Sequence, residues 1–204
     1  MKKTFLLISI LSLLIGCTHK QIGYEDEIKN FQYELNTQFA DAEESPLTEE
    51  DLKSFKTLDF FPIDKKYNIT AKFTRTPNEP VFEMPTTTDR LPLYKKYGVA
   101  YFTLNGKKIE LNIYQNQQLM TSIGYENHLF LPFNDATNGK STYGGGRYID
   151  LEIPEKDTTM IRIDFNRTYN PYCAYNHKYS CPIPPKENTI PIEILAGVKA
   201  YNKH

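Results

Sequence analysis

Two carboxylates in the C-terminal half of the sequence, Asp135 and Asp164, are candidates for acid–base or ligand-binding chemistry. Asp164 is followed directly by polar and aromatic side chains that include Asn166, Arg167 and Tyr169. Loops held by a rigid strand are where binding residues collect, although Asp and Asn at strand ends also cap turns through their own side chains. The pattern therefore leaves two interpretations open, a ligand or catalytic site and structural capping.

A run of three glycines, residues 144–146, separates Tyr143 from Arg147. Such a run permits positive φ or a close backbone approach, and a Gly-rich turn can also hold an anion. It is not a phosphate-binding loop, because Asn134 stands where the first glycine of that motif belongs and a strand follows rather than a helix. A tight turn or bulge is the simpler explanation. The candidate ligand-binding residues are Asp135, Tyr143, Arg147, Asp164, Asn166, Arg167 and Tyr169.

Cys173 and Cys181 are close enough in sequence to form a disulfide in an oxidising compartment. His177 lies midway between them, so the segment also carries three of the four ligands that a structural zinc site needs. The other histidines are remote in sequence, and neither cysteine has an identifiable catalytic partner. A disulfide, two buried thiols and a metal site remain open in that order, and we predict no metal or other cofactor.

The N-terminus has the pattern of a bacterial lipoprotein signal. Lys2 and Lys3 precede an apolar run over residues 5–15, which is too short to span a membrane and ends at Leu14-Ile15-Gly16-Cys17. This ending resembles the lipobox cleaved by lipoprotein signal peptidase. We therefore expect residues 1–16 to be removed, Cys17 to carry the lipid that binds the membrane, and residues 17–23 to form a tether.

The envelope is therefore the expected location. The outer membrane, facing the periplasm, is favoured because Thr18, and not Asp, follows the cysteine that is expected to carry the lipid.

The chain has 204 residues, a net charge of −1 and no basic block, so the sequence does not indicate nucleic-acid binding. The 15 tyrosines and 12 phenylalanines, with no tryptophan, suit β-sheets and sugar-binding surfaces equally. Apart from the membrane, the sequence leaves the partner unidentified, as either a small molecule or a protein.

Residues 24–58 are predicted to be a helical segment. Apolar residues recur every three or four positions from Tyr24 to Phe39, and acidic residues occupy the first turn, as in an amphipathic helix. Thr48 followed by acidic residues predicts the N-cap of a second, short helix.

Residues 59–199 are predicted to be a β domain, beginning with an alternating strand at Tyr67. Asn105-Gly106 predicts a type I′ hairpin that joins strands Val99–Leu104 and Lys107–Tyr114 and pairs Leu104 with Lys107. Leu129–Leu131 and Thr189–Leu195 are further expected strands, the latter at an edge because of Pro191. The expected fold is mainly β, an antiparallel sandwich or barrel-like sheet with one or two N-terminal helices.

A second hairpin is predicted between strands Arg147–Ile153 and Thr159–Phe165, with Asp150 opposite Arg162. Its open end would then bring together the Asp135 loop, the glycine turn and the segment Asp164–Tyr169.

Long blocks of the C-terminal half resemble the bacterial and archaeal domain-of-unknown-function family 1684. These blocks run over residues 131–148, from Leu-Pro-Phe-Asn-Asp to Gly-Gly-Gly-Arg-Tyr, over residues 163–175, and over Cys-Pro-Ile-Pro-Pro-Lys-Glu-Asn at 181–188. The similarity extends back through Ser45-Pro46-Leu47. Blocks of this length are specific for membership, and the resemblance implies no activity.

The sequence therefore predicts a membrane-tethered binding or interaction module and leaves open whether the protein is an enzyme. The alternative is a hydrolase of an envelope carbohydrate or ester, with Asp135 and Asp164 as its acid–base pair. Paired catalytic carboxylates face each other across a cleft at roughly 5–10 Å. A purely structural envelope protein without a pocket is a third possibility.

Overall fold

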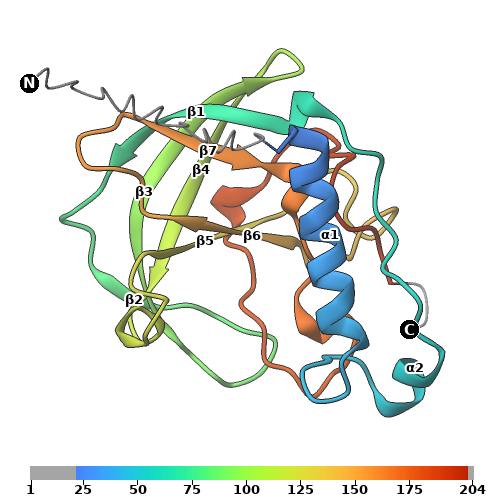
Figure 1. Cartoon of the computed structure of the whole chain (residues 1–204). Coiled ribbons are helices and arrows are strands. Elements are labelled where there is room, and N and C mark those ends of the chain that lie inside the picture. Colours follow the sequence, from blue (N-terminus) through green and yellow to red (C-terminus); the bar gives the residue numbers. More distant parts are fainter. Residues whose placement is uncertain (1–21, 202–204) are drawn as a thin grey trace, which may run out of the picture.

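The computed structural model describes residues 22–201 and is dominated by one antiparallel sheet (Figure 1). The predicted signal peptide, Cys17 and most of the predicted tether lie outside the described residues. The two helices are α1 (Tyr24–Ala40) and α2 (Glu49–Ser54). The strands are β1 (Asn68–Arg75), β2 (Val81–Glu83), β3 (Leu93–Leu104), β4 (Lys107–Asn116), β5 (His128–Phe133), β6 (Arg147–Glu152) and β7 (Met160–Asp164).

The sheet has the strand order β6-β5-β4-β3-β1-β7, with β2 added beside β3. It curves into a half-barrel, so the predicted mainly β, barrel-like class is confirmed. The curvature brings β6 and β7, the two ends of this order, into contact without pairing. The inner face carries the main core, formed by residues such as Leu111, Ile113, Leu131 and Ile163.

The β3–β4 hairpin has the predicted register. Leu104 pairs with Lys107, Phe102 with Ile109, and Ala100 with Leu111. Asn105 and Gly106 have φ of 49° and 73°, the left-handed conformation that a type I′ turn requires.

The predicted hairpin between β6 and β7 is wrong. β6 instead pairs with β5, placing Leu151 opposite Leu129, and β7 pairs with β1, placing Ile163 opposite Ile69. An alternating strand fits any antiparallel neighbour that buries the same face, so the pattern could not select the partner. Asp150 consequently does not face Arg162.

The expected strand at Thr189–Leu195 is also wrong. Thr189 makes only an isolated bridge to Asn134, and the following residues are irregular. Two carbonyls that follow, those of Ile194 and Ala196, accept hydrogen bonds from the Arg147 side chain instead of from a neighbouring strand.

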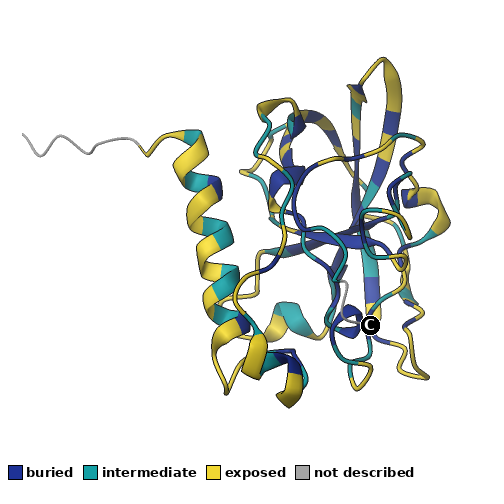
Figure 2. Cartoon of the chain, turned by 90° about the vertical axis from the view of Figure 1, so that its right-hand side faces the viewer, coloured by how far each residue is buried: buried dark blue, intermediate teal, exposed yellow. Residues whose placement is uncertain are grey.

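Both predicted N-terminal helices are present. α1 buries Ile28 and Phe39 on one face, and Figures 1 and 2 show it as a separate layer alongside the sheet with its outer face exposed. The Thr48 hydroxyl caps α2 by accepting from the Asp51 amide at 3.1 Å. Phe39 packs edge-on against Tyr175, with ring centroids 4.8 Å apart, which fixes α1 to the C-terminal segment. In the part of the chain that is described, neither helix has the length and hydrophobicity needed to span a membrane.

Candidate functional site

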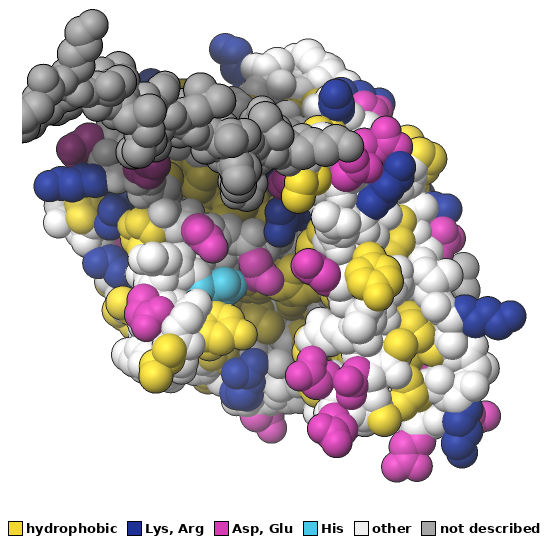
Figure 3. Space-filling model, viewed as in Figure 1, with side chains coloured by type: hydrophobic (Ala, Val, Ile, Leu, Met, Phe, Trp, Pro, Cys, Tyr) yellow, Lys and Arg dark blue, Asp and Glu magenta, His cyan; other side chains and the backbone are white. Residues whose placement is uncertain are grey.

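A cleft of about 1030 Å³ opens between α1, the outer face of β5 and β6, and the loops around residues 90–92, 116–125 and 171–182. Figure 3 shows a hollow with a hydrophobic floor and with acidic side chains and a histidine at its edge. Two phenylalanines, Phe31 and Phe130, line the cleft. Its tyrosines are Tyr94, Tyr125, Tyr148, Tyr169, Tyr172 and Tyr179.

The pleat of β5 and β6 explains why these side chains face the cleft. Leu129 and Ile149 point into the core, and alternate residues of a strand point to opposite faces. His128 and Phe130 of β5 therefore project from the same outer face as Tyr148 and Asp150 of β6, and all four line the cleft. Phe130 and Asp150 are direct cross-strand partners.

A chain of aromatic contacts forms the floor. The Phe130 ring lies 5.7 Å from Tyr94 and 4.7 Å from Tyr148, and Tyr148 lies 5.9 Å from Tyr169 at a near-perpendicular angle. Tyr148 and Tyr169 also exchange backbone hydrogen bonds of 2.9 and 3.1 Å, which place residue 169 against the outer edge of β6. The Tyr148 hydroxyl donates to the Pro182 carbonyl, and burial raises its pKa. Ring contacts, backbone hydrogen bonds and the Tyr148 hydroxyl therefore fix the floor of the cleft.

Three polar side chains, His128, Asp150 and Tyr169, are joined at the centre of this face. The Tyr169 hydroxyl lies 2.8 Å from both carboxylate oxygens of Asp150, and His128 Nε2 lies 2.9 Å from one of them. Burial, followed by the Asp150 carboxylate, raises the pKa of Tyr169 well above its usual value. Tyr169 therefore stays protonated and donates to Asp150.

The Asp150 carboxylate also determines which nitrogen of the His128 ring donates a hydrogen bond. Because the Asp150 carboxylate only accepts, His128 Nε2 carries a proton and donates, which leaves Nδ1 as the acceptor in the neutral ring. Nδ1 is buried and has no hydrogen-bond partner within the described residues. The arrangement fixes the three side chains relative to one another and can orient a polar ligand. No hydroxyl or thiol of residues 22–201 is hydrogen-bonded to this imidazole as a nucleophile would be.

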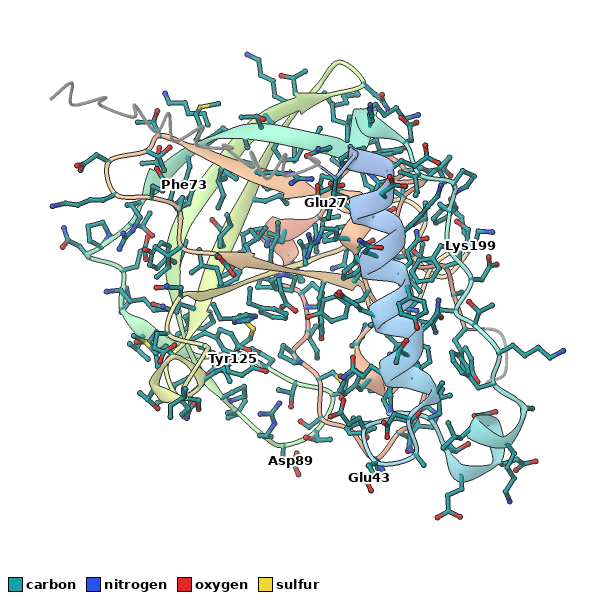
Figure 4. All side chains as sticks on the ribbon, viewed as in Figure 1. Glu27, Glu43, Phe73, Asp89, Tyr125 and Lys199 are labelled. Atoms are coloured by element: carbon teal, nitrogen blue, oxygen red, sulfur yellow. The ribbon has the colours of Figure 1, made fainter. Side chains whose placement is uncertain are left out.

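A second recess of about 480 Å³ lies where the edges of β6 and β7 approach each other. It shares Tyr125, His128 and Asp150 with the cleft, so the two hollows are adjacent. Figure 4 labels Tyr125, on the loop before β5, and Glu27, on the first turns of α1, on different sides of this face. Glu27 accepts from Arg162 at 3.0 and 3.2 Å and from Arg167 at 3.3 Å. Arg162 also donates to Asp164 at 3.0 Å, so two carboxylates balance the two arginines of this recess.

Asp135 and Arg147 do not line the cleft, because they form a buried ion pair. Their closest atoms are 2.8 Å apart, and both side chains have 0% exposure. Arg147 also donates to the carbonyls of Ile194, Ala196 and Val198. Asp135 cannot serve as a solvent-accessible acid–base group in this arrangement.

The Asp135 loop, the glycine turn and the segment Asp164–Tyr169 do converge, although not around an open pocket. Arg147 follows the glycine turn, pairs with Asp135 and lies 3.4 Å from the Thr168 hydroxyl. The turn itself depends on Gly146, which has φ of 91° and where a Cβ would lie 2.8 Å from the Phe133 carbonyl. The place where these three segments meet therefore belongs to the buried core.

Asp164 and Asn166 stabilise the junction between β7 and α1. Asp164, 3% exposed, accepts from the Tyr24 hydroxyl, the Asn166 amide groups and Arg162. Asn166 also donates to Asp64 O. Of the predicted site residues, Tyr169 lines the main cleft, and Asp164 and Arg167 line the second recess.

Cys173 and Cys181 are free thiols that lie together beside the cleft, without the predicted disulfide bond joining them. The Cys173 amide donates to Cys181 Sγ at 3.2 Å, and the Tyr143 hydroxyl lies 3.8 Å from Cys173 Sγ. A hydrogen bond from the Cys181 thiol lowers the pKa of Cys173 to about 6. Burial raises the pKa of Tyr143 to about 12. Across residues 22–201, no three His, Cys, Asp or Glu side chains are grouped to hold a metal.

Sequence reasoning missed His128 and most of the tyrosines around the cleft, and assigned Asp150 to the wrong partner. A signal was available in the alternation of Tyr148 and Asp150 with the apolar Ile149 and Leu151. It identified an outward-facing polar surface, but the contribution of His128 depends on the pairing of β5 with β6.

Comparisons with known proteins place the chain in a family. Residues 53–199 match the model of the family described as protein of unknown function (DUF1684). The chain is also similar to the solution NMR structure of the uncharacterized protein from gene locus rrnAC0354 of Haloarcula marismortui. That match has a TM-score of 0.69 and 30% identity and covers 89% of this chain and 96% of the archaeal one. No curated protein matches the sequence. The chain therefore belongs to the DUF1684 family.

Proposed function

We propose that this protein is a ligand-binding module of the cell envelope, tethered to a membrane by lipid on Cys17. The observation that carries the binding role is the aromatic cleft with the His128–Asp150–Tyr169 group at its centre. A concave site that combines apolar rings with a few fixed polar groups is the usual form of a small-molecule site. Its volume of about 1030 Å³ is at the upper end of the range for such sites.

Binding without chemical conversion is favoured over hydrolysis. The predicted acid–base pair has lost one member, since Asp135 is enclosed with Arg147. The His128 ring has a carboxylate partner on one nitrogen, but its other nitrogen is not bonded to a nucleophile among the described residues. The cleft is therefore assigned to recognition.

The proposed location is the outer membrane, facing the periplasm, because Thr18 and not Asp follows Cys17. A short tether would keep the domain close to that membrane. Residues 18–23 lie between the predicted lipid and α1. An extended chain spans at most ~3.3–3.6 Å per residue, so this segment reaches on the order of 20 Å. α1 follows directly and forms one wall of the cleft.

In-cell photo-crosslinking tests the binding role. A photoreactive phenylalanine analogue replaces Tyr125, which lines the cleft and is 48% exposed, or Tyr101, a control on β3 outside the cleft that is 40% exposed. Illumination should add the mass of a ligand at position 125 and not at position 101, as measured by intact-protein and peptide mass spectrometry. Equal labelling at both positions, or none at either, would refute the assignment.

A further inference from the structure

We infer that the cleft recognises a neutral oligosaccharide, an inference that rests on the proposed binding function. The cleft and the neighbouring recess share Tyr125, His128 and Asp150, so a chain of several sugar units can extend from one into the other. Together they present aromatic faces, hydroxyls and side-chain amides, which are the groups that match a polyhydroxylated ring.

The charged side chains that line the two hollows nearly balance. The acidic ones are Glu34, Asp150, Glu152 and Asp164, and the basic ones are Arg90, Arg162 and Arg167. Asp150 is engaged by His128 and Tyr169. Arg90 keeps its charge, and its guanidinium is held against the loop by donating to the hydroxyl and the carbonyl of Ser180 at 3.2 and 2.8 Å. In the recess, Arg162 is paired with Glu27 and Asp164, and Arg167 is paired with Glu27. A phosphate or carboxylate ligand would need an available cation, because such ligands are held by charge-assisted hydrogen bonds. Because the carboxylates of the lining outnumber its arginines, and two of the three arginines are paired, the site favours an uncharged ligand over an anion.

The aromatic composition of the cleft favours a sugar over a lipid as its ligand. Six of the eight phenyl and phenol rings of the cleft are tyrosines, so nearly every apolar face carries a hydroxyl at its edge. The Tyr148 and Tyr169 hydroxyls already donate to Pro182 and Asp150. An acyl chain would, however, leave a phenol proton such as that of Tyr172 without an acceptor, and unpaired polar groups disfavour binding. A sugar can place its C–H face on a ring and its hydroxyls on the phenol groups.

Tyr172 illustrates such a contact. Gln38 Nε2 donates to its hydroxyl at 2.9 Å, which leaves the phenol proton available to donate to a ligand. Burial raises the pKa of Tyr172, so the phenol keeps this proton. Amides of Asn116 and Gln118 lie along the same cleft. The polar groups are thus predominantly uncharged hydrogen-bonding groups.

The test is a titration of the domain with a matched pair of tetrasaccharides, N-acetylated chitotetraose, which is neutral, and its fully deacetylated form, which is cationic. Cellotetraose and maltotetraose serve as further neutral probes. Because the protein contains 15 tyrosines and no tryptophan, tyrosine emission reports binding directly, and calorimetry gives the affinity. At least one neutral tetrasaccharide should bind, and the N-acetylated form should bind more tightly than the deacetylated form.

Tyr125→Ala should weaken this binding about two- to tenfold, in keeping with the loss of one aromatic contact. Tyr33→Ala is the matched control, since Tyr33 is 72% exposed on α1 and outside the cleft. Thermal melting of both variants confirms folding, and amide chemical-shift mapping of the unmodified protein with the sugar locates the site if Tyr125→Ala is unstable.

Three results would overturn the inference: no binding of any neutral tetrasaccharide, tighter binding of the cationic form, or sugar-induced shifts away from the cleft. Absence of sugar binding together with specific crosslinking at position 125 would reject the ligand class and leave the binding function standing. Absence of both would reject the two together.

Discussion

Replacing Arg147 by methionine should destabilise the fold severely, because the substitution leaves a buried carboxylate without its partner. Arg147 is 0% exposed, lies 2.8 Å from Asp135 and donates to three carbonyls of residues 194–198. Removing one member of a buried ion pair costs about 3–5 kcal/mol. For a domain of this size, about 2–4 °C per kcal/mol gives a fall in Tm of roughly 6–20 °C.

Urea unfolding followed by circular dichroism measures this loss. Arg167→Met is the matched control, since Arg167 is 43% exposed and paired with Glu27 at 3.3 Å. An exposed pair contributes about 0–1 kcal/mol, so the control should change little.

A double variant identifies the cause. Adding Asp135→Asn to Arg147→Met removes the unpaired charge while keeping an oxygen that can accept from Thr137 and Ile194, as the Asp135 carboxylate does. The double variant should therefore be more stable than Arg147→Met alone. A loss below about 1 kcal/mol for Arg147→Met, or a double variant less stable than the single, would refute the reasoning.

Four other outcomes are expected. Cys17→Ala should move the protein out of the membrane fraction or leave uncut precursor, and unchanged membrane association without loss of acyl label would contradict the lipid tether. Cys181→Ala should raise the pKa of Cys173 from about 6, because it removes the hydrogen bond that stabilises the thiolate. Absorbance at 240 nm measures the thiolate as pH is varied, and the same titration curve in the variant and the unmodified protein would contradict this prediction. Because both thiols are free in the structure, alkylation of the native, non-reduced protein should label Cys173 and Cys181 completely; a linked peptide pair in mass spectrometry would instead show the disulfide that the sequence favoured. Asp164→Asn should lower the free energy of unfolding by about 1–3 kcal/mol in urea, whereas lost ligand binding at unchanged stability would assign Asp164 to the site.

Local patterns predicted the elements of this fold well. The Asn105-Gly106 turn determined the register of β3 and β4, and the spacing from Tyr24 to Phe39 identified α1. The partners of β6 and β7 could not be predicted in the same way, because alternation specifies which face is buried and not which strand lies beside it.

The site was harder to predict for two physical reasons. Asp135 and Arg147 are residue types that rarely lie fully buried, so the sequence suggested an accessible pair where the structure has an enclosed one. The His128–Asp150 contact joins residues 22 positions apart through the β5–β6 pairing, and Tyr169 reaches both from a third segment. Such a group becomes visible only once the sheet order is known.

The central claim, that the aromatic cleft is the ligand site, is tested most directly by two-dimensional NMR. The ¹⁵N-labelled domain is titrated with a soluble, detergent-free extract of the cell envelope, so the result does not depend on the ligand class. The account predicts saturable amide shifts at His128, Asp150 and Tyr169, with β3 residues near Tyr101 unchanged. Shifts confined to other surfaces, or a spectrum unaffected by the extract, would contradict it.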